Sequence, residues 1–181
     1  MENLLINIIN TFLFSFLVLI NLVLCFTIGD YFIKKIVSSN SNQQIFDNKN
    51  FNIVPIFGFI IICSILSLVN FFFKINYLIF ISISIFSLFY LKNYKSIFFD
   101  KKKYKIYLVY FVIILFLSKI SMISYFASDT GYYHIPIIKI YNDYNTIFGL
   151  ANLFPQYGFN NLNFYYSAMI TANPFLLRFF A

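Results

Sequence analysis

Two residues that can carry chemistry lie close together in the segment YFASDTGYYHIPIIKIYNDYN, residues 125–145. Asp129 is one of six acidic residues in the chain, and His134 is its only histidine. A carboxylate can act as general base on an acceptor hydroxyl, or help to hold a divalent metal that neutralises a phosphate leaving group. His134 could then hydrogen-bond the phosphate or orient the carboxylate. A structural interpretation stays open beside this one, in which Asp129 caps a helix and His134 is a polar residue at a membrane surface.

The composition indicates an integral membrane protein. Of the 181 residues, 61% are hydrophobic and only 10% are charged, whereas about 25% of the residues in a soluble domain are charged. So little charge cannot cover the surface of a globular protein, and this excludes an ordinary soluble domain. The net charge of +7 does not indicate nucleic-acid binding, because no folded basic domain or stacking platform accompanies the lysines.

Apolar runs of about 17–25 residues predict helices that cross a membrane. The expected fold is all-α, a polytopic membrane protein with four to five transmembrane helices, an extracytoplasmic amphipathic helix and a loop. A loop is expected to begin at Gly29. The predicted spans lie at about 4–28, 53–73, 75–91 and 106–126, within a transmembrane region 1–126; the extracytoplasmic segment is 127–161, and 162–181 forms a partial or fifth span.

Lysine placement orients these helices. The segment 92–105 holds six of the 13 basic residues, which predicts that it lies in the cytoplasm. The segment 29–52 lies two crossings away, so it falls on the same side. The N-terminus and residues 127–161 are then extracytoplasmic.

One face of the first predicted helix carries polar side chains. Asn7, Asn10, Phe14, Leu17 and Asn21 follow one another at spacings of three and four residues. Such a stripe is expected to face other helices, because asparagine side chains can hydrogen-bond across a helix interface.

The residues that follow Asp129 have the pattern of a short amphipathic helix on the membrane surface. Aromatic and apolar residues from Tyr133 onward share one face, and Lys139 lies on the other. Pro136 predicts that the regular part begins near Ile135, with the proline in the first turn. Lys119, at the far end of the fourth run, either snorkels to the outer interface or faces a cavity near Asp129.

The next segment, 146–164, mixes amide side chains with aromatic rings. Gly149, Pro155 and Gly158 indicate turns. Amides can bind the hydroxyls of a sugar while rings pack on its C–H face, although an ordinary loop has the same composition. The amide side chains in this segment include Asn152, Gln156 and Asn160.

The stretch DTGYYHIPIIKIYNDYNTIFGLANLFPQYGFNN, which begins at Asp129, resembles the signature of an uncharacterised bacterial family of multi-pass membrane proteins. That signature is D-[ST]-G-x-Y-H, then I-K-W, then G-L-x-N-L-H-x-R-x-G-x-N-S. The family is linked with surface-polysaccharide synthesis and is similar to GT-C glycosyltransferases. Those enzymes use polyprenyl-phosphate sugars and keep an acidic residue in an early extracytoplasmic loop.

The resemblance implies a protein of the bacterial inner (plasma) membrane, the N-terminal portion of a GT-C-like glycosyltransferase. Asp129 would be the catalytic carboxylate or a ligand of Mg²⁺ or Mn²⁺, and His134 would support it. The expected partners are the bilayer, a polyprenyl-phosphate sugar donor and either a missing C-terminal half or another membrane subunit. The residues expected to bind the donor are Lys119, Tyr133, Lys139, Asn152, Gln156 and Asn160.

The chain departs from the signature in ways that weaken the glycosyltransferase hypothesis. Phe154, Gln156 and Asn161 stand where the family has His, Arg and Ser. Loss of a basic pair could remove contacts to phosphate, and GT-C enzymes have about twice as many spans as are expected here. The chain is therefore expected to be inactive alone, and the alternative is a non-enzymatic membrane component or an inert truncated product.

Overall fold

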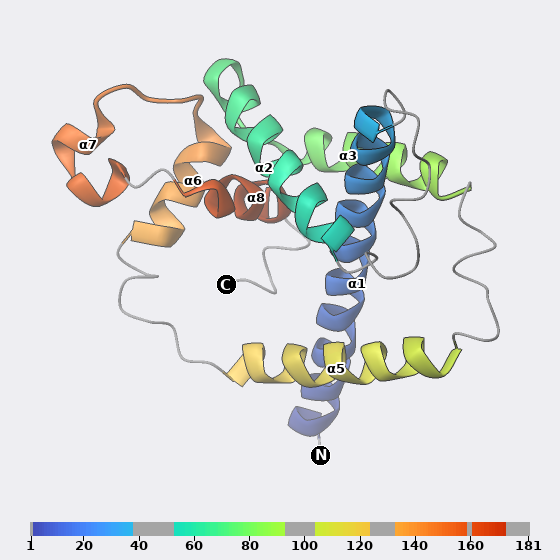
Figure 1. Cartoon of the computed structure of the whole chain (residues 1–181). Coiled ribbons are helices and arrows are strands. Elements are labelled where there is room, and N and C mark those ends of the chain that lie inside the picture. The colour runs from blue at the N-terminus through green and yellow to red at the C-terminus, as the bar shows by residue number, and fades with distance from the viewer. Residues whose placement is uncertain (1, 38–52, 93–103, 124–132, 159–160, 173–181) are drawn as a thin grey trace.

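A computed structural model describes residues 2–37, 53–92, 104–123, 133–158 and 161–172. Every regular element in these ranges is a helix, which confirms the all-α prediction for the described part of the chain. The elements are α1 (Glu2–Val37), α2 (Ile53–Phe72), α3 (Tyr77–Leu91), α5 (Tyr104–Ile123), α6 (Ile135–Asp143), α7 (Leu150–Leu153), the 3₁₀ helix η5 (Pro155–Gly158) and α8 (Leu162–Thr171) (Figure 1).

Two of the described helices are long and apolar enough to cross a membrane. They are α1, over Asn7–Ile36, and α2, over Ile53–Phe72. The apolar parts of α3 (Tyr77–Leu91) and α5 (Leu108–Ile120) are shorter. The two long helices are consistent with a membrane protein, whereas the four to five crossings stay a prediction.

The first helix is longer than the sequence predicted. It continues through Gly29 and Asp30 to Val37, so a loop that begins at Gly29 is wrong. Glycine within a helix usually costs about 1 kcal/mol relative to alanine, but here it allows close packing. A Cβ atom on Gly29 would lie 2.2 Å from the carbonyl oxygen of Val54, and one on Gly58 would lie 1.7 Å from that of Cys25. The backbones of α1 and α2 therefore cross in direct contact, as small residues permit in membrane helices.

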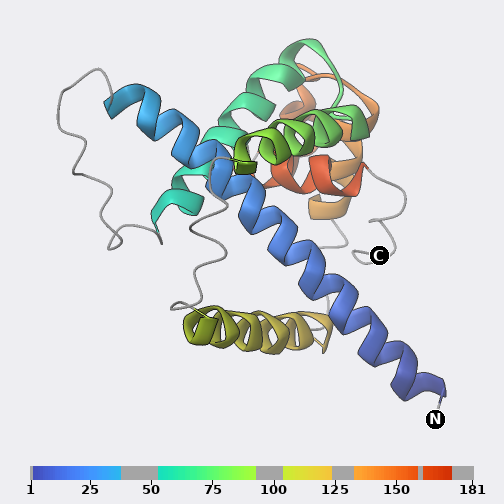
Figure 2. The same cartoon turned by 90° about the vertical axis from the view of Figure 1, so that its right-hand side faces the viewer.

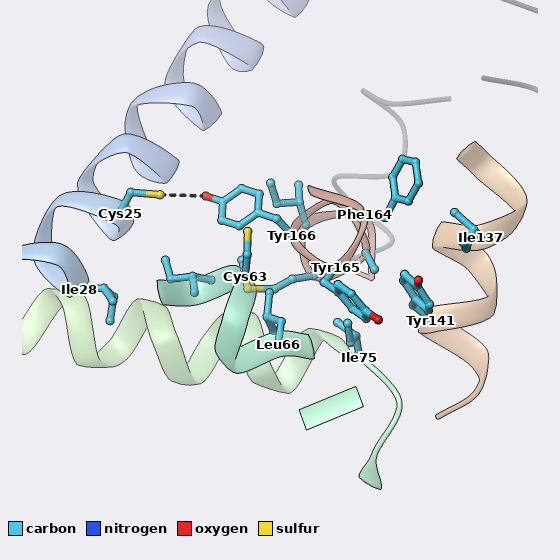
Figure 3. Packing of buried hydrophobic residues seen from close by; sticks show 14 residues of the cluster. Cys25, Ile28, Cys63, Leu66, Ile75, Ile137, Tyr141, Phe164, Tyr165 and Tyr166 are labelled. Atoms are coloured by element: carbon cyan, nitrogen blue, oxygen red, sulfur yellow. Dashed lines mark hydrogen bonds between the residues drawn. The ribbon is translucent and has the colours of Figure 1, made fainter. Parts of the chain in front are cut away.

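Helix α8 lies at the centre of the packed part of the molecule. It contacts α2, α3 and α6, and Figure 2 shows it enclosed among them. Ala168 and Met169 are fully buried there, together with Ile62, Leu66 and Ile137 from α2 and α6. Figure 3 shows this cluster from close by. The segment that the sequence predicted as a fifth span thus forms, over Leu162–Thr171, the middle of the core.

Helix α5 lies apart from that core. It contacts α1, and Figures 1 and 2 show it beside the N-terminal half of α1, which it crosses at a steep angle. Most of its described side chains are exposed, and Ser118 is an exception at 2% exposure. The molecule thus has a packed half and an open half.

The two ends of α2 have different neighbours. Near its N-terminal end, the last turns of α1 and α3 are joined where the Tyr90 hydroxyl donates to the Asp30 carboxylate (2.9 Å). At its C-terminal end, the turn into α3 lies against α6, and the backbone N–H of Ile75 donates to the carbonyl of Tyr141 (2.9 Å). The C-terminal ends of α1 and α3, from which the two lysine-bearing connections start, therefore lie at one end of the bundle. Helix α6 lies at the other end.

Candidate functional site

Part of the predicted site lies outside the described residues. Asp129 and Asn160 belong to this part, so the pairing of Asp129 with His134 and the metal role of Asp129 stay predictions. In the ranges that the structure describes, no group of three or more His, Cys, Asp or Glu side chains could hold a metal ion. The described residues alone therefore do not form a Mg²⁺ or Mn²⁺ site.

His134 lies at the start of α6, in an aromatic setting. Its ring is half-buried, and the ring centroid lies 4.3 Å from that of Tyr133, in an edge-on contact. The centroid of the Phe164 ring on α8 is 5.0 Å away. Pro136 follows in the first turn of α6, where its missing N–H costs nothing. These contacts fix the imidazole at the junction of α6 and α8.

Buried Asn70, near the C-terminus of α2, holds the C-terminal end of α6. Its side-chain amide N–H groups point to the carbonyls of Phe73 (3.4 Å), Tyr141 (3.5 Å) and Tyr144 (3.3 Å). Its amide oxygen accepts from the Thr146 hydroxyl (3.2 Å), and its backbone carbonyl accepts from the Thr146 N–H (2.8 Å). The amide thus hydrogen-bonds to carbonyls at a helix end, where no intrahelical N–H group is available to them.

A second asparagine ties α6 to α8. With its amide oriented to satisfy both groups, Asn142 donates to the carbonyls of Ala168 (2.8 Å) and Ile75 (3.1 Å). Beside it, the rings of Tyr141 and Tyr165 stack at 4.3 Å. Burial raises the pKa of the Tyr141 phenol, and the neighbouring Tyr165 raises it further, so this hydroxyl stays protonated. Helix α6 is therefore clamped between the α2–α3 turn and α8.

An apolar groove of about 410 Å³ lies between α1, α2 and α8. Its few polar atoms include those of Asn21, Cys25 and Tyr166. The Tyr166 hydroxyl donates to the amide oxygen of Asn21 (2.8 Å) and lies 3.4 Å from the sulfur of Cys25, as Figure 3 shows for the Cys25 contact. Phe14 and Leu17 also line the groove, so this part of the predicted stripe faces other helices.

The other predicted binding residues do not line this groove. Lys119 is exposed on α5, Lys139 is exposed on α6, and Asn152 is exposed on α7. Tyr133 is half-buried beside His134. Gln156, on η5, is partly buried, and its side-chain oxygen has no hydrogen-bond partner among the described residues. Sequence reasoning missed Asn70, Asn142 and Tyr166; a polar residue at the end of an otherwise apolar span, as Asn70 is, could have pointed to a helix contact.

The family described as Domain of unknown function (DUF8201) matches residues 11–180. The chain belongs to this family. No curated protein and no solved structure matches the chain. Because the match runs from α1 past α8, both the groove and the clamped α6 belong to the family domain. Its description names no chemistry, so the resemblance to glycosyltransferases stays a hypothesis.

Proposed function

We propose that this chain is the N-terminal, membrane-embedded part of a GT-C-like glycosyltransferase, and that it binds the lipid tail of a polyprenyl-phosphate sugar. The observation that carries this proposal is the groove between α1, α2 and α8. It holds about 410 Å³ and is almost wholly apolar. A polyprenyl chain is a hydrocarbon without hydrogen-bonding groups, and small-molecule sites of this size are typically lined by apolar and aromatic side chains.

The polar groups of the groove do not oppose such a ligand. Asn21 and Tyr166 hydrogen-bond each other, and the Asn21 amide N–H also donates to the carbonyl of Leu17 (2.8 Å). A hydrocarbon that enters the groove therefore leaves none of these groups without a partner, which would otherwise cost about 1–3 kcal/mol each.

The sugar-phosphate would lie near α6, on the extracytoplasmic side. The lysine-bearing segments begin at the opposite end of α2, which supports this orientation. Asp129 would act as general base or metal ligand, and His134 would orient it or hydrogen-bond the phosphate. The clamp on α6 supports this role, because catalytic groups need a fixed geometry.

The chain alone is proposed to transfer no sugar. A carboxylate open to water gains little from electrostatic preorganisation, so later helices would be needed to enclose the substrate. Phe154 and Gln156 also bring no positive charge to the loop that would meet the phosphate. This last observation favours the second candidate, a non-enzymatic membrane component.

A photoreactive polyprenyl phosphate tests the groove. The chain is purified in phospholipid nanodiscs, labelled with the probe, and the labelled peptides are identified. Labelling is expected on the groove faces of α1 and α8, and Val18→Trp, which fills the groove, should reduce it several-fold. Leu68→Trp, on an exposed face of α2 outside the groove, is the matched control. Labelling that is uniform over the lipid-facing helices, or equal in both variants, would refute a tail-binding groove.

Glycan synthesis in a strain that lacks the locus tests catalysis. The 181-residue chain alone should not restore synthesis, whereas a version joined to a C-terminal half from a relative should, and Asp129→Asn should abolish that restoration. Restoration by the joined version that survives Asp129→Asn would favour the non-enzymatic component.

A further inference from the structure

A small hook projects from the helix bundle after α6. It comprises residues 147–158, and its two short helices, α7 and η5, contact mainly each other (Figure 1). Phe148 is 81% exposed and Leu153 is 83% exposed, more than any other large apolar side chain in the described ranges. Exposing such side chains to water costs about 25 cal/mol for each Å² of apolar surface. An apolar surface of this kind indicates a binding partner.

The hook carries no charge that would hold it in water. From Tyr144 to Thr171 the sequence contains no Asp, Glu, Lys, Arg or His. Its polar side chains are amides and phenols, such as Asn152 and Tyr157, which can bind lipid headgroups and water together. Residues of this type, with aromatic rings, are typical of the boundary between headgroups and hydrocarbon.

The end of α2 sets the depth of the hook in the membrane. Thr146 is bonded to Asn70 through both its backbone and its side chain. The Phe148 ring then packs against the ring of Phe71, with centroids 6.0 Å apart. Phe71, at the end of α2, is itself exposed, as are Phe72 and Phe73 after it. Since α2 has the length and composition of a spanning helix, this end lies at the hydrocarbon boundary, and so does Phe148.

Gly149 lets the chain reverse direction directly after Phe148. It has φ of +80°, a left-handed conformation that costs other residues about 1–2 kcal/mol. The space around it is open, since an added Cβ would meet only the Asn152 side chain at 3.5 Å. Backbone conformation, not packing, therefore requires glycine at this position.

We propose that the hook is a membrane-interface anchor that inserts Phe148 and Leu153 into the bilayer leaflet at the C-terminal end of α2. The lipid is favoured as the partner because the exposed rings of Phe71–Phe73 continue the surface of the hook, and because no charge pair is offered to a protein. The inference is independent of glycosyl transfer. It assigns the loop to lipid, where sequence analysis expected a sugar.

Tryptophan fluorescence tests the anchor, because the chain has no tryptophan of its own. Phe148→Trp and Leu153→Trp are prepared singly and reconstituted into vesicles of phosphatidylethanolamine and phosphatidylglycerol. A fraction of the lipid carries bromine near the carbonyl end of one acyl chain. Phe72→Trp serves as the lipid-facing reference, and Lys139→Trp, on the exposed face of α6, as the polar one.

The expected result is a blue-shifted emission and several-fold stronger quenching by brominated lipid at positions 148 and 153 than at 139, similar to position 72. Quenching by aqueous iodide, without quenching by lipid, would overturn the proposal. Protection from both quenchers would overturn it as well, because it would show that another protein surface covers the hook.

Charge substitutions provide an independent measurement. Phe148→Asp or Leu153→Asp should increase cleavage of the loop by protease added to the vesicles, since an inserted carboxylate leaves the interface. Asn145→Asp, at an exposed position before the hook, is the matched control and should change little. Equal cleavage of all three variants would argue against insertion.

Discussion

The two halves of α1 share a membrane-like composition but have different surroundings. Residues 24–30 are all buried against α2 and α3. The side chains in this run are exposed by 7% or less, namely Leu24, Cys25, Phe26, Thr27, Ile28 and Asp30. In the N-terminal half, Ile8, Phe12 and Phe16 are among the side chains exposed by 46–62%. Hydropathy therefore does not separate the packed half from the open half.

Close contacts at small residues do separate them. The packed half of α1 carries Cys25, Thr27 and Gly29, and the Thr27 hydroxyl bonds Ser87 of α3. The open half exposes mainly Ile and Phe, although Ser15 within it is buried. Lipid tails are as apolar as these side chains, so burying them brings little gain in a membrane, whereas small residues bring backbones together.

Four substitutions test this contrast. The two free, buried thiols, Cys25 and Cys63, provide a reporter, since a thiol-reactive dye labels them on unfolding.

The largest effect is expected for Gly58→Ala. Its new methyl group would meet backbone atoms of Cys25 and Gly29, which cannot rotate away as a side chain could. The free energy of unfolding in detergent should fall by about 3 kcal/mol or more. Ser64→Ala, on the exposed face of the same helix, should change it by less than about 0.5 kcal/mol. A stable Gly58→Ala protein would mean that α1 and α2 do not cross at these glycines.

Asn70→Leu should have the next largest effect. The substitution keeps the side-chain size but removes the amide partner of the Tyr144 carbonyl and one of two partners of the Tyr141 carbonyl, which keeps the Ile75 N–H; the expected cost is about 2 kcal/mol. Hydrogen exchange of the amides in 141–147 should rise, because α6 loses its anchor. Asn145→Leu, at an exposed position on the same turn, should leave exchange unchanged. No change in the Asn70 variant would show that the clamp is dispensable.

Tyr90→Phe tests the contact between the last turns of α1 and α3. The phenol donates to the carboxylate of buried Asp30, which also pairs with Lys34 at 3.0 Å. Losing a hydrogen bond to a charged group should cost about 1.5 kcal/mol, measured as a lower midpoint of thermal thiol labelling. Tyr77→Phe, at the exposed start of α3, should leave the midpoint in place. The reverse pattern would exclude this contact.

Phe16→Ala should have the smallest effect. The Phe16 side chain is 62% exposed, so its removal should change the free energy of unfolding in detergent by about 0.5 kcal/mol or less. Thiol labelling against temperature would show this. A loss as large as that expected for Gly58→Ala would mean that the open half of α1 is packed against protein, for example against a second copy.

Composition and apolar run length predict the helices well, because the cost of leaving backbone groups unpaired in lipid leaves few alternatives. The predicted end of the first helix was wrong for a physical reason. Gly29 and Asp30 look like the start of a loop when read alone, but their partners, Val54 and Tyr90, come much later in the chain. A local pattern contains no information about such partners.

The candidate site could be predicted less well. The pattern around His134 predicts a helix, and the structure has one over Ile135–Asp143. The pattern could not reveal that Asn70 holds this helix, since that contact spans 71–76 residues of sequence. Because asparagine is abundant in the chain, the sequence also does not show which few asparagines make tertiary contacts.

The central position of α8 has a consequence for how the protein is made. Helices α1 and α2 leave the ribosome early and can pair at their glycines at once, but Tyr166 follows Cys25 by 141 residues. Contacts so distant in sequence form late. Until α8 has been made, the amide oxygen of Asn21 lacks the Tyr166 hydroxyl, and the space that Met169 fills stays open. Docking of α8 is thus the step that turns loosely associated helices into a packed core, and it is the point at which cellular quality control can tell these two states apart.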